Sequence, residues 1–424
     1  WAAGTFRFPM ADTDTPETPR SLPHYVAQRA HQGFNCIFII AALPNWVDDG
    51  LPATLDTDEG MVVRRAWPQT DTRHAKPMHD EDGNLPFQFP GRVPGFEQSV
   101  PDLDRINPAY FRSLDRKIDY LNAHGFIPFI EPARRDIGQV WAKHHDWPSS
   151  YARYVQYIWS RYQANNCLLS PIHYDLGAFS VPAPMWSQAA NAVVDTYGMP
   201  PFGTPVGANS DGSSLLNFGH TDAAPWLDFH QTGNARRDHY SYAQLTDAFN
   251  SNPPVPVLNG EPQYEGMRFR QVPGWYYGET KLGVAPSEEA ARHVRSAAYG
   301  SVLSGGLAGH IYGAGGWDGG IWRGDVEEAS PVPIWDAMQW PGAAQMQHMT
   351  CFLQHAGDRY VELVPSLQLV DPNRSGPVTG FDGWAYCAAT PARDLLLIYL
   401  EHGTPTASVT QLPPETDYQG RWFD

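Results

Sequence analysis

The sequence predicts an α/β fold, a (β/α)8 barrel followed by a small antiparallel β-sandwich domain. Short apolar runs alternate about eight times with segments of helical spacing, which indicates parallel strands joined by crossover helices. Eight such units favour a closed barrel over an open sheet. Beyond about residue 357 the helical spacing ends and strand-like runs follow. We therefore expect a catalytic barrel over 1–356 and a truncated β domain over 357–424.

The expected barrel strands are short apolar runs bounded by glycine, proline or polar residues. The run NCIFII at 35–40 is the clearest example. The full set is Trp1–Phe6, Asn35–Ile40, Ile127–Ile130, Cys167–Asp175, Thr204–Ala208, Trp226–His230, Val257–Leu258 and Leu307–Tyr312.

The expected helices begin at capping residues or show apolar residues at helical spacing. Asn107 followed by Pro108 begins one helix, and Ser287 followed by two glutamates begins another. The expected helices cover 21–33, 107–124, 150–163, 186–197, 240–249, 287–304 and 334–355. The segment 41–106 is long, polar and without strong periodicity, so we expect a functional loop there. In the β domain, strand-like runs occur at 361–364, 383–387, 395–400 and 407–412.

The composition limits the class of partner. Hydrophobic residues make up 42% of the 424 residues and charged residues 18%, and no apolar run approaches the ~20 residues that span a bilayer. The net charge of -17 argues against a nucleic-acid partner, because phosphate binding needs basic surfaces. Aromatic residues are 13%, with 15 Trp, which suits a carbohydrate partner. The four cysteines have no CxxC spacing; we expect buried thiols, with one disulfide left open.

The stretch PVLNGEPQYEG at 256–266 contains the strongest candidate for a catalytic residue. Val257 and Leu258 fit a buried parallel strand, and Pro262 ends it. Glu261 then stands at the carboxyl end of the strand, where α/β barrels bind their ligands. We interpret Glu261 as a candidate catalytic carboxylate.

Polar and aromatic residues follow the other expected strands as well. Because the carboxyl ends of barrel strands meet at one mouth, we expect these side chains to gather there. Amides, histidines and aromatic rings around carboxylates suit the binding of a sugar. The expected sugar-binding residues are His173, Tyr174, Asp228, His230, Gln231, Asn259, Tyr264, His310, Tyr312 and Trp317.

Glycoside hydrolysis needs one carboxyl group that donates a proton and a second that attacks or activates water. Glu261 and Asp175, on opposite strands of the expected barrel, are our candidates. A separation of about 5–5.5 Å would mean retention and about 6.5–9.5 Å inversion. Glu131 is a rival for Asp175, because IEP at 130–132 resembles GEP at 260–262, and Glu265 is a rival for Glu261.

Three other interpretations stay open at this point. Asp175 could instead pair with Arg134 or Arg135. A barrel that binds carbohydrate without cleaving it is a second alternative. A metal-dependent hydrolase is a third, although the HxD at 173–175 and the DxH at 228–230 lack an HxH or HExxH motif beside them. A serine or cysteine nucleophile lacks a GxSxG elbow. We expect neither a metal nor a cofactor.

Several blocks of the sequence resemble the apiosidase-like glycoside hydrolases (glycoside hydrolase family 140, domain-of-unknown-function family 4038). These blocks are QGFN at 32–35, NPAYFRSLDRKIDYLNAHGF at 107–126, VLNGEPQYEG at 257–266 and RSAAYGSVLSGGLAGHIYGAGG at 295–316, with YCAATPARDLLLIYL in the β tail. The resemblance covers nearly the whole chain. GEP-x-YEG and AGHxYG are its most specific parts.

The resemblance implies a (β/α)8 barrel with an appended β domain and a retaining pair of one Asp and one Glu. By the matching motif, Glu261 would be the nucleophile and Asp175 the acid/base residue, and the location would be secreted or periplasmic. The sequence departs from the family where His173-Tyr174-Asp175 replaces Gly-Gly-Asp, and where AAGTF replaces a Gly-Asp-Thr run. We therefore expect a glycosidase that acts on a side chain of a polysaccharide or oligosaccharide, without assigning apiose as its sugar.

Overall fold

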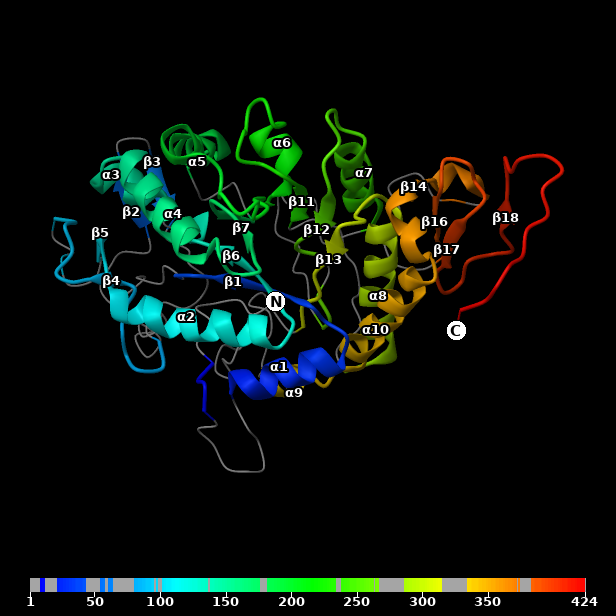
Figure 1. The fold of residues 1–424 in the computed structure, drawn as a ribbon, viewed down its shortest axis with the longest axis horizontal. Coiled ribbons are helices and arrows are strands. Elements are labelled where there is room, and N and C mark those ends of the chain that lie inside the picture. The colour runs from blue at the N-terminus through cyan, green and yellow to red at the C-terminus, as the bar shows by residue number, and fades with distance from the viewer. Residues whose placement is uncertain are drawn as a thin grey trace. The chain divides into compact units, whose positions relative to one another are not determined.

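The computed structural model describes residues 8–11, 21–42, 54–57, 60–63, 80–94, 97, 101–135, 138–175, 181–233, 238–262, 264–266, 286–314, 334–371, 373 and 383–423 (Figure 1). Its internal contacts divide the chain into two compact units. The first is built mainly from residues 35–229 and the second mainly from 230–324 and 332–424. None of the helices in these described ranges is long and apolar enough to cross a bilayer.

The first unit contains short parallel strands separated by helices. β1 (Cys36–Ile40) pairs in parallel with β6 (Ile127–Glu131), and β6 pairs with β7 (Leu168–Leu169). β8 (His173–Tyr174) pairs in parallel with β9 (Asn209–Ser210). Single parallel bridges, Arg134 to His173 and Leu169 to Val206, extend these pairings. Parallel neighbours joined by helices are the repeating unit that the sequence predicts.

The helices of the first unit surround these strands. Asn107 caps α2, because its side chain accepts a hydrogen bond from the amide of Ala109 at 3.1 Å. Trp159 on α4 donates to the carbonyl of Ser170, and such contacts hold the helix on the strands. The helices are α1 (Leu22–His31), α2 (Pro108–Ala123), α3 (Gly138–His144), α4 (Ser149–Tyr162), α5 (Ala183–Tyr197) and α6 (Ser214–Phe218).

The segment 41–106 contains strands where the sequence predicted only a loop. β2 (Thr54–Thr57) and β3 (Gly60–Val63) form an antiparallel pair, as do β4 (Phe87–Gln88) and β5 (Asp102–Ile106). Phe87 is buried beside Trp141 and Tyr154. The prediction of a loop was therefore wrong for these residues, which form two short antiparallel strand pairs despite their polar and charged composition.

The second unit repeats the same pattern. β11 (His230–Gly233), β12 (Val257–Asn259) and β13 (Gly309–His310) are parallel neighbours, with α7 (Asp238–Phe249) and α8 (Glu288–Leu303) between them in the chain (Figure 1). Ser287 caps α8 through the amide of Ala290, and two glutamates occupy its first turn. Negative charge there is favourable because helix amino ends carry partial positive charge.

The end of the chain forms antiparallel sheets. β14 (Val364–Pro365), β16 (Ala385–Ala389) and β17 (Leu396–Leu400) make one sheet, and β15 (Val370–Asp371) pairs with β18 (Ser408–Val409). A small core of Leu369, Val370, Ala385, Cys387 and Ala389 lies between them. Strands are confirmed in the predicted runs 383–387, 395–400 and 407–412, whereas Val361 and Glu362 of the fourth run belong to a 3-10 helix and β14 begins only at Val364. The remaining elements are β10 (Gly212–Ser213) and the 3-10 helices η5 (Gly357–Glu362) and η6 (Leu367–Leu369).

Several predicted boundaries were wrong. The predicted helix 334–355 is two helices, α9 (Ile334–Ala337) and α10 (Pro341–Gln354), because Pro341 takes the first position of a new helix. The predicted strand Cys167–Asp175 is interrupted between β7 and β8, where Pro171 cannot donate a ladder hydrogen bond.

Two further strands begin later than predicted. Strand β9 starts at Asn209 and strand β11 at His230. All four cysteines are free thiols, and Cys351 is exposed rather than buried. The predicted strand Trp1–Phe6 lies outside the described residues.

Candidate active site

In the first unit, three polar side chains follow one another at the carboxyl ends of β6 and β8. Glu131 is the last residue of β6, and His173 and Asp175 belong to β8 and the residue after it. Nδ1 of His173 lies 2.6 Å from Oε2 of Glu131, and Nε2 of His173 lies 3.5 Å from Oδ2 of Asp175. All three are buried. The structure thus brings the two candidate acids of this unit together through one imidazole.

Two arginines approach Asp175 from the segment that follows β6. Arg134 donates to Oδ2 of Asp175 at 3.2 Å, and Arg135 donates to Oδ1. Both guanidinium groups are almost completely buried, with side chains 5% and 4% exposed. The sequence predicts this ion pair only as an alternative to catalysis, and with either Arg134 or Arg135 as the partner of Asp175. The structure instead pairs Asp175 with both arginines. The two arginines stand directly in the sequence, as ARR at 133–135 after IEP at 130–132.

The direction of the side chains on β8 separates His173 from Tyr174. His173 is level with Asn209 of β9, and Nδ2 of Asn209 lies 3.3 Å from Nδ1 of His173. Tyr174 points to the other face, where its ring packs on Phe218 of α6. Burial raises the pKa of the Tyr174 hydroxyl, and the charge of Asp211 adds to this. His173 therefore belongs with the polar groups and Tyr174 with the helix layer, which does not fit the sugar contact expected of Tyr174.

In the second unit, Glu261 is the second residue after the end of β12, with Gly260 between them. Its side chain is buried, with the residue 1% exposed. The backbone amide of Glu261 donates to Oδ1 of Asn259 at 3.3 Å, and Nδ2 of Asn259 donates to Ser301 of α8 at 2.9 Å. Asn259 thus connects the strand end to α8 and fixes the backbone of Glu261, a role that the sequence did not predict.

Gly260 has a steric reason to be glycine. A Cβ placed on Gly260 would lie 2.1 Å from Oε1 of Gln231. The Gln231 side chain therefore lies against the backbone immediately before Glu261. Gln231 is completely buried and its strand position is level with Leu258. Like Asn259, Gln231 is a predicted sugar contact that lies beside Glu261.

The remaining polar residues of this sheet face the helices. Thr232, Asn259 and His310 are level with one another in the register of β11, β12 and β13, so they share one face of the sheet. Because Asn259 reaches Ser301 on α8, this is the helix-facing side. Burial lowers the pKa of His310 to about 3, which keeps its imidazole neutral. His230 lies two residues before Thr232 on the same face, so neither His230 nor His310 fits the predicted sugar contact.

Tyr312 and Glu265 form a structural contact. The hydroxyl of Tyr312 donates to Oε2 of Glu265 at 2.6 Å, and the amide of Gly342 donates to Oε1 at 3.0 Å. Both Tyr312 and Glu265 are buried. The ring of Tyr264 packs directly against Gly313, where an added Cβ would lie 2.3 Å from it. These three side chains pack inside the second unit, so Glu265 is a poorer nucleophile candidate than Glu261.

Two predicted residues remain. Asp228 precedes β11 and therefore lies at the amino end of that strand, because the strand begins later than predicted. Its carboxylate accepts a hydrogen bond from the amide of Val206 at 2.9 Å; desolvation raises its pKa and this bond opposes the shift. A position at the amino end does not fit the expected sugar contact. Trp317 lies outside the described residues.

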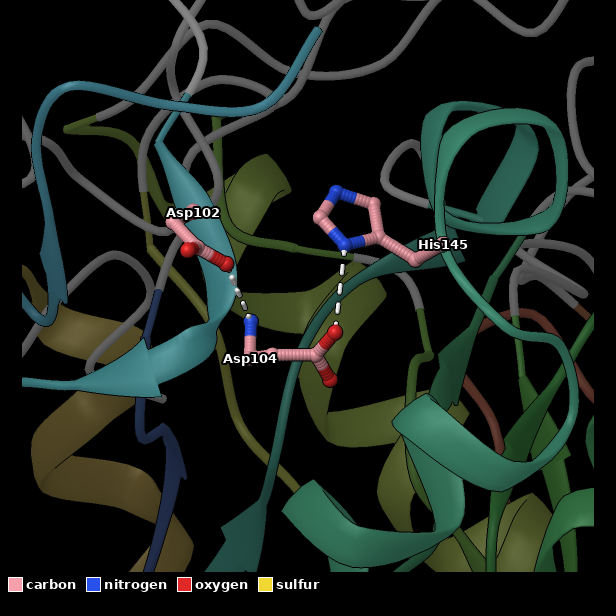
Figure 2. A group of neighbouring side chains, drawn as sticks. All are labelled: Asp102, Asp104 and His145. Atoms are coloured by element: carbon pink, nitrogen blue, oxygen red, sulfur yellow. Dashed lines mark hydrogen bonds and ion pairs between the residues drawn. The ribbon is translucent and has the colours of Figure 1, made fainter.

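One further group of side chains has the composition of a metal site. Asp102 and Asp104 on β5 and His145, after α3, place ligand atoms within 4.8 Å of one another (Figure 2). Arg92 already supplies a cation to this group: its Nε lies 2.8 Å from Asp102 Oδ1, and its Nη2 donates to Asp104. His145 turns Nδ1 toward Asp104, at 3.6 Å (Figure 2). The group is an ion-pair network that joins β5 to the end of α3.

The pKa values of this network follow from its contacts. Burial raises the pKa of Asp104, but hydrogen bonds from Ser150, Arg92 and Arg153 outweigh it and lower the pKa to about 2. Burial lowers the pKa of His145, and the charge of Asp104 opposes this. Asp104 is therefore an ionised acceptor at neutral pH rather than a proton donor.

The structure is similar to those of known glycoside hydrolases. A solved structure described as a glycoside hydrolase shares 18% identity with a TM-score of 0.56, over 89% of this chain and 75% of that one. A glycoside hydrolase family 5 structure from Bacteroides vulgatus shares 16% identity with a TM-score of 0.53, over 94% and 83%. Structures of this kind are TIM barrels of mixed α/β content, so the α/β class of the predicted fold is confirmed. Among curated proteins, none matches this sequence.

The sequence itself matches one family model. That model is described as the catalytic domain of apiosidase-like proteins, and it matches residues 7–357, most of the chain. The GEP-x-YEG and AGHxYG blocks, which carry the resemblance noted in the sequence, lie inside the matched range. The chain therefore belongs to the apiosidase-like family and is a glycoside hydrolase.

Proposed function

We propose that this glycosidase retains the anomeric configuration, with Glu261 as nucleophile and Asp175 as general acid and then base. The observation that carries the proposal is Glu261 itself, a buried carboxylate at the carboxyl end of β12 with its backbone held by Asn259 and with Gln231 against Gly260. Strand carboxyl ends are where α/β barrels carry out catalysis. Asp175 is likewise at the carboxyl end of a strand, as the first residue after β8.

The proposed reaction has two balanced steps. A carboxylate oxygen of Glu261 forms a bond to the anomeric carbon while the glycosidic C–O bond breaks, and the leaving oxygen takes a proton from Asp175. A water molecule then gives a proton to Asp175, its oxygen bonds to the anomeric carbon, and the bond to Glu261 breaks. The enzyme returns to its starting protonation state.

The substrate class and the finer architecture belong to the same proposal. We propose a sugar at the end of a side chain of a polysaccharide or oligosaccharide, held by Gln231 and Trp317. The family match and the alternation of strands and helices support an eight-stranded barrel over 1–356. The antiparallel strands support a β sandwich over 357–424.

Substitution of the two carboxylates tests the mechanism. On a panel of 4-nitrophenyl glycosides that includes the apioside, Glu261→Gln should abolish turnover, and Asp175→Asn should lower kcat for poor leaving groups by about 10²–10⁴-fold. Azide should restore turnover of an Asp175→Ala variant and give a glycosyl azide of retained configuration. The control is Glu265→Gln, a second buried glutamate, which should stay active. An active Glu261→Gln enzyme, or inversion seen by NMR of the first product formed, would refute the proposal.

A further inference from the structure

The acid/base role of Asp175 raises a physical difficulty that the structure itself resolves. A general acid must hold a proton, whereas two buried guanidinium groups at Asp175 stabilise its ionised form. Arginine cannot give up its own proton in a protein. The proton that Asp175 delivers must therefore be kept on a neighbouring group, and His173 is the titratable side chain of this unit next to it.

The contacts of His173 decide which ring nitrogen carries a hydrogen. Nδ1 lies 2.6 Å from Oε2 of Glu131 and 3.3 Å from Nδ2 of Asn209. An ionised carboxylate can only accept a hydrogen bond, and it is the closer of the two. Nδ1 therefore carries a hydrogen and donates it to Glu131, so in the neutral imidazole the lone pair is on Nε2.

That lone pair faces Asp175. Nε2 lies 3.5 Å from Oδ2 of Asp175, so an ionised Asp175 beside a neutral His173 would place two lone pairs opposite each other. One proton between the two groups removes this repulsion. Because Arg134 and Arg135 stabilise the carboxylate and Glu131 stabilises the imidazolium, the proton resides on His173 in the resting enzyme.

We infer that His173, oriented by Glu131, is a positioning residue that stores the proton which Asp175 delivers to the leaving group. The inference rests on the proposed role of Asp175. As the glycosidic bond breaks, Nε2–H of His173 passes its proton to Asp175, and Asp175 passes a proton to the leaving oxygen, which leaves His173 neutral and Asp175 ionised. When water attacks in the second step, its proton passes to Asp175 and back to Nε2. The 3.5 Å separation shortens on substrate binding, as catalytic hydrogen bonds commonly do.

The groups around His173 are consistent with this storage. In the first unit, the carboxylates of Glu131 and Asp175 lie near opposite ring nitrogens of His173, both guanidinium groups donate to Asp175, and Asn209 is neutral. Burial, and then the charge of Glu131, raises the pKa of Tyr151 on α4, so Tyr151 stays neutral. Its hydroxyl donates to the carbonyl of Pro171.

A pair of leaving groups tests the inference. With the glycosides that the wild type accepts, His173→Gln and Glu131→Gln should lower kcat/KM for phenyl glycosides by about 10²-fold, because phenol needs a proton from a general acid. 2,4-Dinitrophenyl glycosides, whose leaving group needs none, should lose less than about threefold. The control is Glu401→Gln, which removes a buried carboxylate that accepts from Trp384 and Tyr386 in the β domain. Glu401→Gln should leave kcat/KM unchanged for both the phenyl and the 2,4-dinitrophenyl glycosides. Equal losses on both leaving groups would overturn the inference.

NMR of the wild-type enzyme gives a second, substrate-free measurement. With ¹⁵N-labelled histidine, both ring nitrogens of His173 should show the shifts of protonated nitrogen at neutral pH, and the Nδ1 proton should resonate far downfield. The downfield signal should be absent from the spectra of His173→Gln and of Glu131→Gln, which assigns it to His173. If His173→Gln does not fold, the Glu131→Gln spectrum alone makes this assignment. A neutral His173 with an unprotonated Nδ1 overturns the inference. An active Asp175→Asn enzyme with a protonated His173 would instead refute the acid/base role of Asp175.

Discussion

Oε2 of Glu131 lies 2.6 Å from Nδ1 of His173, and both side chains are completely inaccessible to solvent. A buried carboxylate or imidazole destabilises a fold unless it is paired, so this contact joins the carboxyl ends of β6 and β8. It also explains why the rival Glu131 is a poor acid: its carboxylate accepts the imidazole hydrogen. His173 is thus the residue that makes Glu131 compatible with burial, whereas Arg134 and Arg135 pair with Asp175.

The contact between Asn259 and Glu261 predicts different effects for two neighbouring substitutions. Asn259→Ala removes the acceptor of the Glu261 amide and should lower kcat about tenfold or more, since a misplaced nucleophile reacts slowly. Ser301→Ala removes only the partner of the Asn259 amide group and should cost about 1 kcal/mol of stability with kcat unchanged. Urea denaturation and steady-state kinetics on both variants measure this. Equal kcat values for the two variants would contradict the assignment.

Gly260→Ala tests whether Gln231 lies against the strand end. The backbone at Gly260 does not have a positive φ, so alanine is compatible with the backbone, but its Cβ would meet Oε1 of Gln231. We expect a loss of about 1–3 kcal/mol from overpacking and a raised KM as the amide is displaced. In the double variant Gly260→Ala/Gln231→Ala the stability loss should be smaller than the sum of the single losses. A purely additive double-mutant cycle would show that the two residues do not touch.

The helices were the most predictable part of the fold. Asn107 and Ser287 cap α2 and α8 at the expected positions, because a capping side chain acts within three residues along the chain. Burial was a weaker guide to strands. Trp226 and Phe229 are buried, yet β11 begins only at His230, since an apolar run packs equally well in a turn.

The candidate site was predictable in position but not in its contacts. Glu261 and Asp175 lie just after strands, as the short apolar runs and the polar residues or prolines that follow those runs predicted. That Asp175 meets two arginines and His173 depends on the register between β6 and β8, which is a long-range property. For the same reason Asn259, His230 and His310 were expected to contact sugar, although a one-residue difference in strand position turns a side chain toward the helices.

Tyr312→Phe should affect stability rather than sugar binding. The hydroxyl of Tyr312 donates to Oε2 of Glu265, and its removal takes one donor from a buried carboxylate. We expect a loss of about 1–3 kcal/mol, visible as a lower Tm, with KM unchanged. Thermal unfolding and steady-state kinetics measure the two effects. A raised KM with an unchanged Tm would return Tyr312 to the sugar-binding residues that the sequence predicted.

The ion-pair network around Asp104 should make stability depend on pH in the acid range. The pKa of Asp104 is about 2 in the folded protein and its ordinary value is 3.8, so between these values the unfolded chain binds more protons. The contribution of Asp104 is therefore fully present above about pH 5 and is lost as pH falls toward 2.

The difference in the free energy of unfolding between wild type and Asp104→Asn should be constant from pH 7 to 5 and shrink by pH 3. Ser150→Ala, which removes one donor to Asp104, should give a smaller change of the same sign. Urea denaturation across this range measures both, and a difference that stays constant down to pH 3 would show that Asp104 is not stabilised in its ionised form.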